Sequence, residues 1–201
     1  LLQQALASVG RGYVHLDDTK KAVRLTADEM RLDFGGVAKG YAADQALKSL
    51  QAEGISRALV NGGGDMVLGE PPPDRPGWRI GVAPLDPQEP PSQILELANC
   101  AIATSGDVWQ FVEIGGIRYS HIVDPRTGLG VTQRSSVTVI ARDAMTADAL
   151  ASAVCVLGPA KGLQLVDRSC GASCLVVWVE NGKPRTQHTS RFPERSAGAA
   201  K

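Results

Sequence analysis

Two glycine-rich segments constrain the fold of this chain more than any other feature of its sequence. The first runs from Asp33 to Gly40, and the second, Asn61 to Asp65, holds three consecutive glycines. Glycine lets the backbone take positive φ angles and approach a ligand closely, and the exposed N–H groups of such turns bind phosphate. Neither segment has the GxGxxG spacing of a dinucleotide-binding turn or the GxxxxGK of a phosphate-binding loop. A pair of tight turns is the simpler explanation of either segment taken alone.

Apolar periodicity places regular elements around these turns. A helix is predicted after the first glycine turn, with apolar residues at helical spacing at Val37, Ala38, Tyr41, Ala42, Ala46, Leu47 and Leu50. Another is predicted from Ala144 to Leu157, closed by Gly158–Pro159 and continued at 162–166. Short segments, of which 13–16, 22–25 and 78–82 alternate between apolar and polar residues, predict strands at residues 13–16, 22–25, from 30 into the first glycine turn, 58–60, 66–68, 78–82, 94–98, 100–104, 109–114, 117–123, 136–140 and 174–180. With a further helix over 1–9, the pattern predicts an α+β fold with mixed sheets and covering helices.

Length and charge limit the classes of partner. We expect residues 1–189 to form a single domain and the Ser/Arg/Ala/Gly-rich tail, residues 190–201, to be disordered. The 21 basic residues balance the 21 acidic residues, so the net charge gives no reason to expect a nucleic acid or an anionic membrane as partner. No stretch approaches the ~20 consecutive apolar residues of a membrane span.

The four cysteines do not indicate a metal site. None forms a CxxC pair, so the ligand spacing of a zinc centre is missing. Cys155 lies in an apolar run and is interpreted as a small buried residue. Cys170 and Cys174 are close enough in the chain for a disulfide in an oxidising compartment, and the sequence leaves that pairing open.

The helix predicted from Ala144 carries a carboxylate and a hydroxyl on one face. Asp148 and Ser152 are four residues apart, so both side chains project over the same turn. Such an oxygen pair suits Mg²⁺ when phosphate groups supply further ligands. Helix capping is the alternative, with Thr146 as the N-cap and Asp148 favouring the helix N-terminus.

The segment Ser120 to Gly128 brings a histidine, an aspartate and an arginine to one sharp turn. Turns at strand ends often carry catalytic groups, and His121 can act as an acid, a base or a phosphate ligand near neutral pH. A turn stabilised by an Asx-type hydrogen bond from Asp124 explains the same residues without a ligand.

These segments occur in one order along the chain, as the blocks Leu32–Asp44, Ala58–Asp65, Ala103–Gly106, Tyr119–Gly128, Val137–Ala141 and Thr146–Ser152. The series closely resembles the FAD:protein FMN transferases of the ApbE (thiamine-biosynthesis-lipoprotein-like) family, over about residues 1 to 180. The resemblance implies an ApbE-like, T-fold-related domain that binds FAD and Mg²⁺. It also implies transfer of FMN to a Thr or Ser hydroxyl of an acceptor protein, with release of AMP.

The resemblance assigns roles residue by residue. Asp33 and Lys39 match flavin-contacting positions, and Val123 matches a position that lines the flavin. Asp148 and Ser152 match the metal-binding Asp and Thr/Ser of the family. Ala151, between them, could contribute through its backbone at most, and Gly36 matches a position that offers an oxygen to Mg²⁺, here its carbonyl. His121 matches the motif histidine, and we predict that it is the base acting on the acceptor hydroxyl.

Two other functions would use the same residues. A Mg²⁺-dependent FAD pyrophosphatase would give FMN and AMP with water as the acceptor, and a binding module would hold FAD without turnover. Family members carry a further N-terminal block that contributes to the FAD site, and this chain begins beyond the corresponding position. The resemblance also implies a periplasmic location or the periplasmic face of a bacterial inner membrane, with the lipid anchor common in the family.

Overall fold

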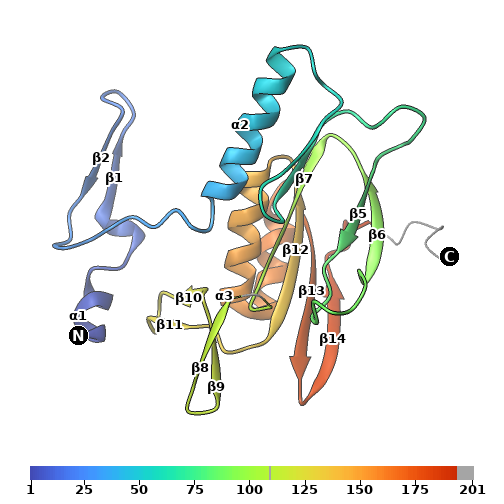
Figure 1. The fold of residues 1–201 in the computed structure, drawn as a ribbon. Helices are drawn as coiled ribbons and strands as arrows, with labels where there is room; N and C mark the ends of the chain where they lie inside the picture. The colour runs from blue at the N-terminus through green and yellow to red at the C-terminus, as the bar shows by residue number, and fades with distance from the viewer. Residues whose placement is uncertain (109, 194–201) are drawn as a thin grey trace.

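A computed structural model describes residues 1–108 and 110–193, and its architecture confirms the predicted α+β fold (Figure 1). The helices are α1 (Leu2–Ala7), a short 3₁₀ turn η1 (Arg11–Tyr13), α2 (Ala38–Ala52) and α3 (Ala144–Arg168). The first seven strands are β1 (Val14–Asp17), β2 (Ala22–Leu25), β3 (Leu59–Asn61), β4 (Met66–Leu68), β5 (Trp78–Val82), β6 (Gln93–Leu97) and β7 (Cys100–Gly106). The others are β8 (Phe111–Ile114), β9 (Ile117–Ser120), β10 (Val123–Asp124), β11 (Leu129–Gly130), β12 (Ser135–Ala141), β13 (Ser173–Glu180) and β14 (Lys183–His188).

The centre of the fold is a six-stranded sheet in the order β14-β13-β12-β7-β4-β3, in which each pairing is antiparallel. All seven residues of β12 are buried, because both faces of the sheet are covered at this strand. On one face α3 packs against it, and on the other lies the β5–β6 hairpin (Figure 1). Both faces of β12 are therefore buried, including the polar residues Ser135, Ser136 and Thr138.

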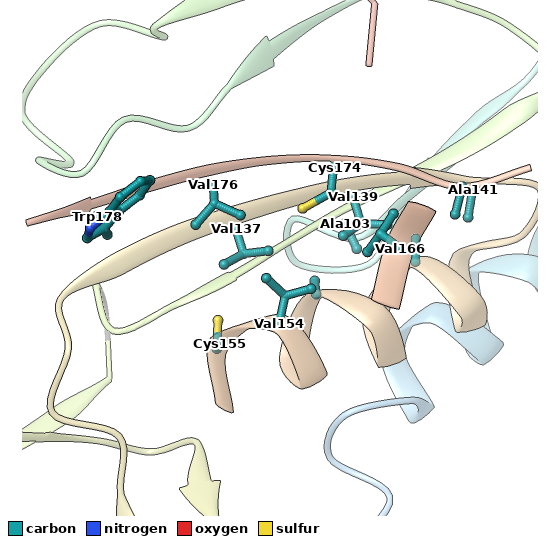
Figure 2. Close-up of a cluster of buried hydrophobic side chains, with 13 residues drawn as sticks. Ala103, Val137, Val139, Ala141, Val154, Cys155, Val166, Cys174, Val176 and Trp178 are labelled. Carbon is teal, nitrogen blue, oxygen red and sulfur yellow. The ribbon is translucent and has the colours of Figure 1, made fainter. Parts of the chain in front are cut away.

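Residues alternate between the two faces, and each face has its own core. Val137, Val139 and Ala141 of β12 lie toward α3, where they pack with Val154 and Val166 (Figure 2). Ile140 belongs to the opposite core, which contains residues of β4, β5, β6, β7 and β13 together with Phe192. The sheet is therefore the middle layer of three, and α3 is the helix that the larger core fixes to it.

Helix α3 consists of two helical segments. Gly158 has φ of 74° and ψ of 171° and precedes Pro159, so the helix is interrupted where the sequence predicted a stop. The N-cap is Asp143, whose carboxylate accepts a hydrogen bond from the N–H of Thr146. The helix begins at Ala144 as predicted, so the alternative interpretation of Thr146 as its N-cap was wrong.

Helix α3 is the one helix in the described part of the chain that is long and apolar enough to cross a membrane. Its most apolar stretch has a mean hydropathy of 1.5. Eight of its residues are buried inside the fold. Packing against the sheet thus accounts for its apolar composition.

Helix α2 begins where the sequence predicted, and its buried face matches the predicted apolar positions only in part, at Leu47. The buried positions are Gly40, Ala43, Asp44 and Leu47, whereas Tyr41 is 53% exposed. The reason is a close crossing with α3: a Cβ at Gly40 would lie 2.2 Å from the carbonyl oxygen of Ala144. Asp44 accepts hydrogen bonds from the N–H groups of Ala144 and Met145 at 2.8 and 3.0 Å, and so binds the free N–H groups at the start of α3.

The segment before α2, residues 1–37, has no buried residue. Helix α1 and the β1–β2 hairpin form as predicted, but the strand expected from Met30 into the glycine turn does not. Asp33 instead accepts a hydrogen bond from the N–H of Gly35 at 2.7 Å, which curls the backbone into a turn.

The predicted tail lies partly outside the described residues, which end at 193. Residues 190–193 are ordered against the body of the protein rather than free: Phe192 is 6% exposed, and the Arg191 guanidinium donates to four backbone carbonyls, those of Val166, Asp167, Ser169 and Ala172. Cys170 and Cys174 are both free; Cys170 is exposed and Cys174 is buried.

Candidate functional site

Three segments that are far apart in the sequence meet beside the N-terminal half of α3. They are the first turn of α2, the loop between β3 and β4, and the α3 turn that carries Asp148. Asp148 is 2% exposed, and one of its oxygens accepts a long hydrogen bond of 3.4 Å from the N–H of Gly40. A carboxylate with so little solvent and only this one hydrogen bond from the described residues has free capacity to bind a cation.

The environment of Asp148 changes its acidity. Burial raises the pKa of its carboxyl above the ordinary value of 3.8, and the negative charge of Asp65 raises it further. The Gly40 N–H and the Lys39 ammonium lower that pKa, but their effect is smaller. Asp148, Asp65 and Lys39 therefore form one electrostatic group.

Lys39 extends from the first turn of α2 to the β3–β4 loop. Its Nζ lies 2.7 Å from Oδ2 of Asp65, whose side chain is 1% exposed, while the lysine side chain is 52% exposed. The ammonium thus meets a buried carboxylate at one side and solvent at the other.

The predicted hydroxyl and glycine positions also meet here. Ser152 lies one turn beyond Asp148, and its Oγ is 3.3 Å from Oγ of Ser105 in β7. A Cβ at Gly36 would lie 3.4 Å from Ser152 Oγ, so the glycine backbone passes directly over this hydroxyl. Ala151, in contrast, is fully buried in the core between α3 and the sheet, and its methyl side chain has no ligand atom, so it could contribute only its backbone carbonyl.

The groups brought together are the Asp148 carboxylate, the hydroxyls of Ser105 and Ser152 and the backbone of Gly36. Carboxylate and hydroxyl oxygens are among the hard ligands that Mg²⁺ prefers. Within residues 1–108 and 110–193, no three His, Cys, Asp or Glu side chains are grouped so that they could hold a metal ion. A cation at Asp148 would accordingly have few protein ligands and would share its coordination with oxygens of a bound ligand. That chemistry fits Mg²⁺ with a phosphate group.

The histidine turn carries the other residues that the sequence predicted for the site, His121 and Val123. His121 is exposed and follows β9, and its Nδ1 lies 3.1 Å from the carbonyl oxygen of Gln110. A carbonyl only accepts, so Nδ1 carries the proton and Nε2 of the neutral ring can accept one. Val123, in β10, is 52% exposed.

Asp124 and Arg126 shape this turn rather than extend it toward a ligand. Asp124 accepts a hydrogen bond from the N–H of Arg126 and forms a two-point ion pair with its guanidinium. Hydrogen bonds from Arg126 hold the pKa of Asp124 below its usual range. The Asx-type turn considered from the sequence is therefore present.

Arg126 also shows where the turn lies along α3. Its Nη2 lies 3.3 Å from the carbonyl oxygen of Val156. Val156 is eight residues beyond Asp148, about 12 Å along the helix axis at 1.5 Å per residue. No hydrogen bond or ion pair between described residues joins His121 or Val123 to the Asp148 group, and Asp33 lies exposed on the loop before α2.

Several residues of the site were missed by sequence reasoning. Asp65 and Ser105 lie in blocks that the sequence singled out, but neither was given a role. Gly40 and Asp44 hold α2 to α3. The sequence signal for Asp65 is its place directly after three glycines. In that place a charged side chain lies close to a backbone turn.

Comparison with known proteins identifies relatives of this chain. The model of the ApbE family matches residues 1–176. An FAD:protein FMN transferase of Vibrio cholerae is 34% identical over 173 residues, covering 85% of this chain and 52% of that protein. One of Klebsiella pneumoniae is 36% identical over 194 residues, covering 94% of this chain and 55% of that protein.

Solved structures show the same similarity. The ApbE protein of Thermotoga maritima superposes with a TM-score of 0.82 at 34% identity, over 94% of this chain and 60% of that one. The flavin transferase ApbE of Vibrio cholerae gives a TM-score of 0.83 at 30% identity, over 95% of this chain and 60% of that one. The chain spans about half the length of the curated relatives that it matches. By its sequence and its fold, this chain belongs to the ApbE family.

Proposed function

We propose that this protein takes part in protein flavinylation, by Mg²⁺-dependent transfer of FMN from FAD to a Thr or Ser hydroxyl of an acceptor protein, with release of AMP. The observation that carries the proposal is the group around Asp148, a nearly fully buried carboxylate beside Ser152 and the Gly36 backbone. The relatives are named FAD:protein FMN transferases, which supports the choice of substrate.

In this proposal Asp148, Ser152 and the carbonyl of Gly36 hold the cation. When bound, Mg²⁺ neutralises pyrophosphate charge and so favours breakage of the P–O bond to AMP. Lys39 adds a fixed positive charge on the same side, and Asp33 and Val123 contact the flavin.

His121 is the proposed base. Its Nδ1–H donates to the Gln110 carbonyl, which leaves Nε2 free to take the proton of the acceptor hydroxyl. The open position of this turn gives an acceptor protein access to it. We also propose a periplasmic location, or attachment at the periplasmic face of the inner membrane.

The test is to incubate the protein with FAD, Mg²⁺ and an acceptor domain that carries a flavinylation site, and to look for covalent flavin fluorescence on a denaturing gel. We expect a fluorescent acceptor band that is lost with EDTA or with Asp148→Ala. Asp167→Ala is the matched control, because Asp167 is an exposed carboxylate near the other end of the same helix. With His121→Ala, FAD binding should remain while transfer falls by about 10²–10⁴-fold.

Two other results would change the proposal. Release of AMP without any acceptor would identify an FAD pyrophosphatase. Binding of FAD by folded protein, without AMP release or a fluorescent band, would identify a binding module.

A further inference from the structure

The buried aspartates of this fold differ in what holds them. Asp44 accepts two backbone N–H groups at the start of α3. Asp107 accepts the N–H of Ser135 and forms an ion pair with Arg118. In both cases, interactions with the rest of the fold offset the cost of burying a carboxylate.

Asp65 is more deeply buried than either, and its charged partner among the described residues is a lysine whose side chain is half exposed. Its side chain is 1% exposed, and its Oδ2 has no hydrogen-bond partner of good geometry among the described residues. The charge that faces it is the Lys39 ammonium, 2.7 Å from that oxygen. A buried carboxylate is costly unless paired, so the position of Asp65 depends on Lys39.

Lys39 depends on Asp65 in turn. A lysine side chain is long and flexible, and that of Lys39 is 52% exposed, so without an anchor its ammonium would take many positions in solvent. The buried carboxylate fixes the ammonium in one place. Lys39 directly precedes Gly40, whose N–H donates to Asp148 at 3.4 Å, so the anchored side chain starts beside the carboxylate proposed to hold the cation.

We propose that Asp65 is a positioning residue of the site: through their buried ion pair it holds the Lys39 ammonium beside Asp148, as a fixed positive charge for the bound dinucleotide. Asp65 itself touches neither FAD nor the cation. This inference rests on the proposed function for the identity of the dinucleotide, but the anchoring of Lys39 is a property of the protein alone.

The anchoring is tested without FAD. The rate at which an amine-reactive acylating reagent modifies Lys39 is measured by mass spectrometry in the wild-type protein and in Asp65→Asn. Lys48, exposed on the same helix, is the internal control. We expect Asp65→Asn to speed modification of Lys39 by about tenfold, because a charge-assisted hydrogen bond is lost, and to leave Lys48 unchanged. An unchanged Lys39 rate in a folded variant would overturn the proposal.

The functional part is tested by FAD binding in the presence of Mg²⁺, for wild type, Asp65→Asn, Lys39→Met and the double variant. If Asp65 acts through Lys39, each single variant weakens FAD binding about tenfold and the double variant is no weaker than Lys39→Met. Multiplied effects in the double variant would overturn the proposal. So would loss of Mg²⁺ binding on Asp65→Asn in the Lys39→Met background, which would make Asp65 a cation ligand.

Thermal unfolding and circular dichroism of each variant show whether it is folded. If Asp65→Asn does not fold, Asp65→Glu replaces it, since it keeps the charge but moves the carboxylate. It should also speed modification of Lys39, and an unchanged rate would count against the anchor. Absence of FAD binding by the wild type would refute the proposed function, while the modification rates would still decide on the anchor.

Discussion

The two ends of the site rest on very different parts of the molecule. None of residues 1–39 is buried, although this segment includes large apolar side chains such as Leu16 and Phe34. β12, in contrast, is buried at all seven positions and packs against α3. Asp148 and Ser152 therefore stand on a rigid layer, whereas Asp33, Gly36 and Lys39 come from the open segment and its junction with α2. A proposed cation site on buried elements next to an exposed loop is a common division in enzymes, because binding loops are drawn from the less stable parts of a fold.

The central sheet and the N-terminal segment should differ most in the rates of amide hydrogen exchange. Amides of β12 should exchange only through global unfolding, while those of β1 and β2 exchange through local opening, so we expect protection to differ by about 10³-fold or more. Exchange followed by mass spectrometry at residues 135–141 and 14–25 measures this. Similar protection in the two regions would break the comparison.

Truncating a side chain to alanine should lower the free energy of unfolding much more in the central sheet than in the N-terminal segment. Leu68 is 1% exposed in β4, and Leu68→Ala should lower the free energy of unfolding by about 2–5 kcal/mol. Leu16 is 63% exposed in β1, and Leu16→Ala should change it by no more than about 0.5 kcal/mol. Urea denaturation of both variants checks this, and equal losses would show that the N-terminal hairpin is part of the cooperative core.

The junction between the regions is tested at Gly40. Gly40→Ala places a methyl group 2.2 Å from the Ala144 carbonyl oxygen, and backbone cannot move aside as a side chain can. We expect a loss of about 3 kcal/mol, with weaker FAD binding because α2 is displaced. Gly12→Ala is the control, since nothing lies within 4 Å of its Cβ. If both variants melt together, the close crossing of α2 and α3 is not needed.

The smallest expected effect concerns pH. The pKa of Asp148 is raised in the folded protein, so its ionised form destabilises the cation-free fold; this penalty is full above the raised pKa and disappears as the pH falls to about the ordinary value of 3.8. Asp148→Asn should therefore stabilise cation-free protein at neutral pH, with a gain that fades on acidification.

Asp124 should change the stability with pH in the opposite direction. Its pKa is lowered by Arg126, so its contribution is present above the ordinary value and is lost as the pH falls through the lowered one. Asp124→Asn should then be less stable than wild type at neutral pH and equal to it in strong acid. Thermal unfolding of both variants in EDTA between pH 3 and 8 measures the two trends, and the same sign for both would contradict the assignment.

Periodicity and glycine signals predicted most elements, including the stop at Gly158, because both depend on local backbone geometry. The face of α2 could not be predicted this way: Gly40 is buried because it meets α3, and that meeting is a property of the tertiary fold. The strand expected from Met30 failed for a similar reason, since a strand needs a partner and none pairs with it. At the site, Asp148 and Ser152 were placed by helical spacing alone, whereas the partnership of Asp65 with Lys39 joins two separate elements and has no local signature.

The contact between the N–H of Gly40 and Asp148 joins residues 108 positions apart in the chain. Closing a flexible loop of that length costs about 4 kcal/mol of chain entropy beyond a constant, from (3/2)RT ln n. Asp44 and Ala144, 100 positions apart, close in the same step. A folding intermediate that contains only hairpins and single helices therefore lacks the contact between α2 and α3 that the proposed cation site needs. During refolding, Mg²⁺ affinity should return with the slowest folding phase, which makes a bound cation a kinetic reporter of the completed fold.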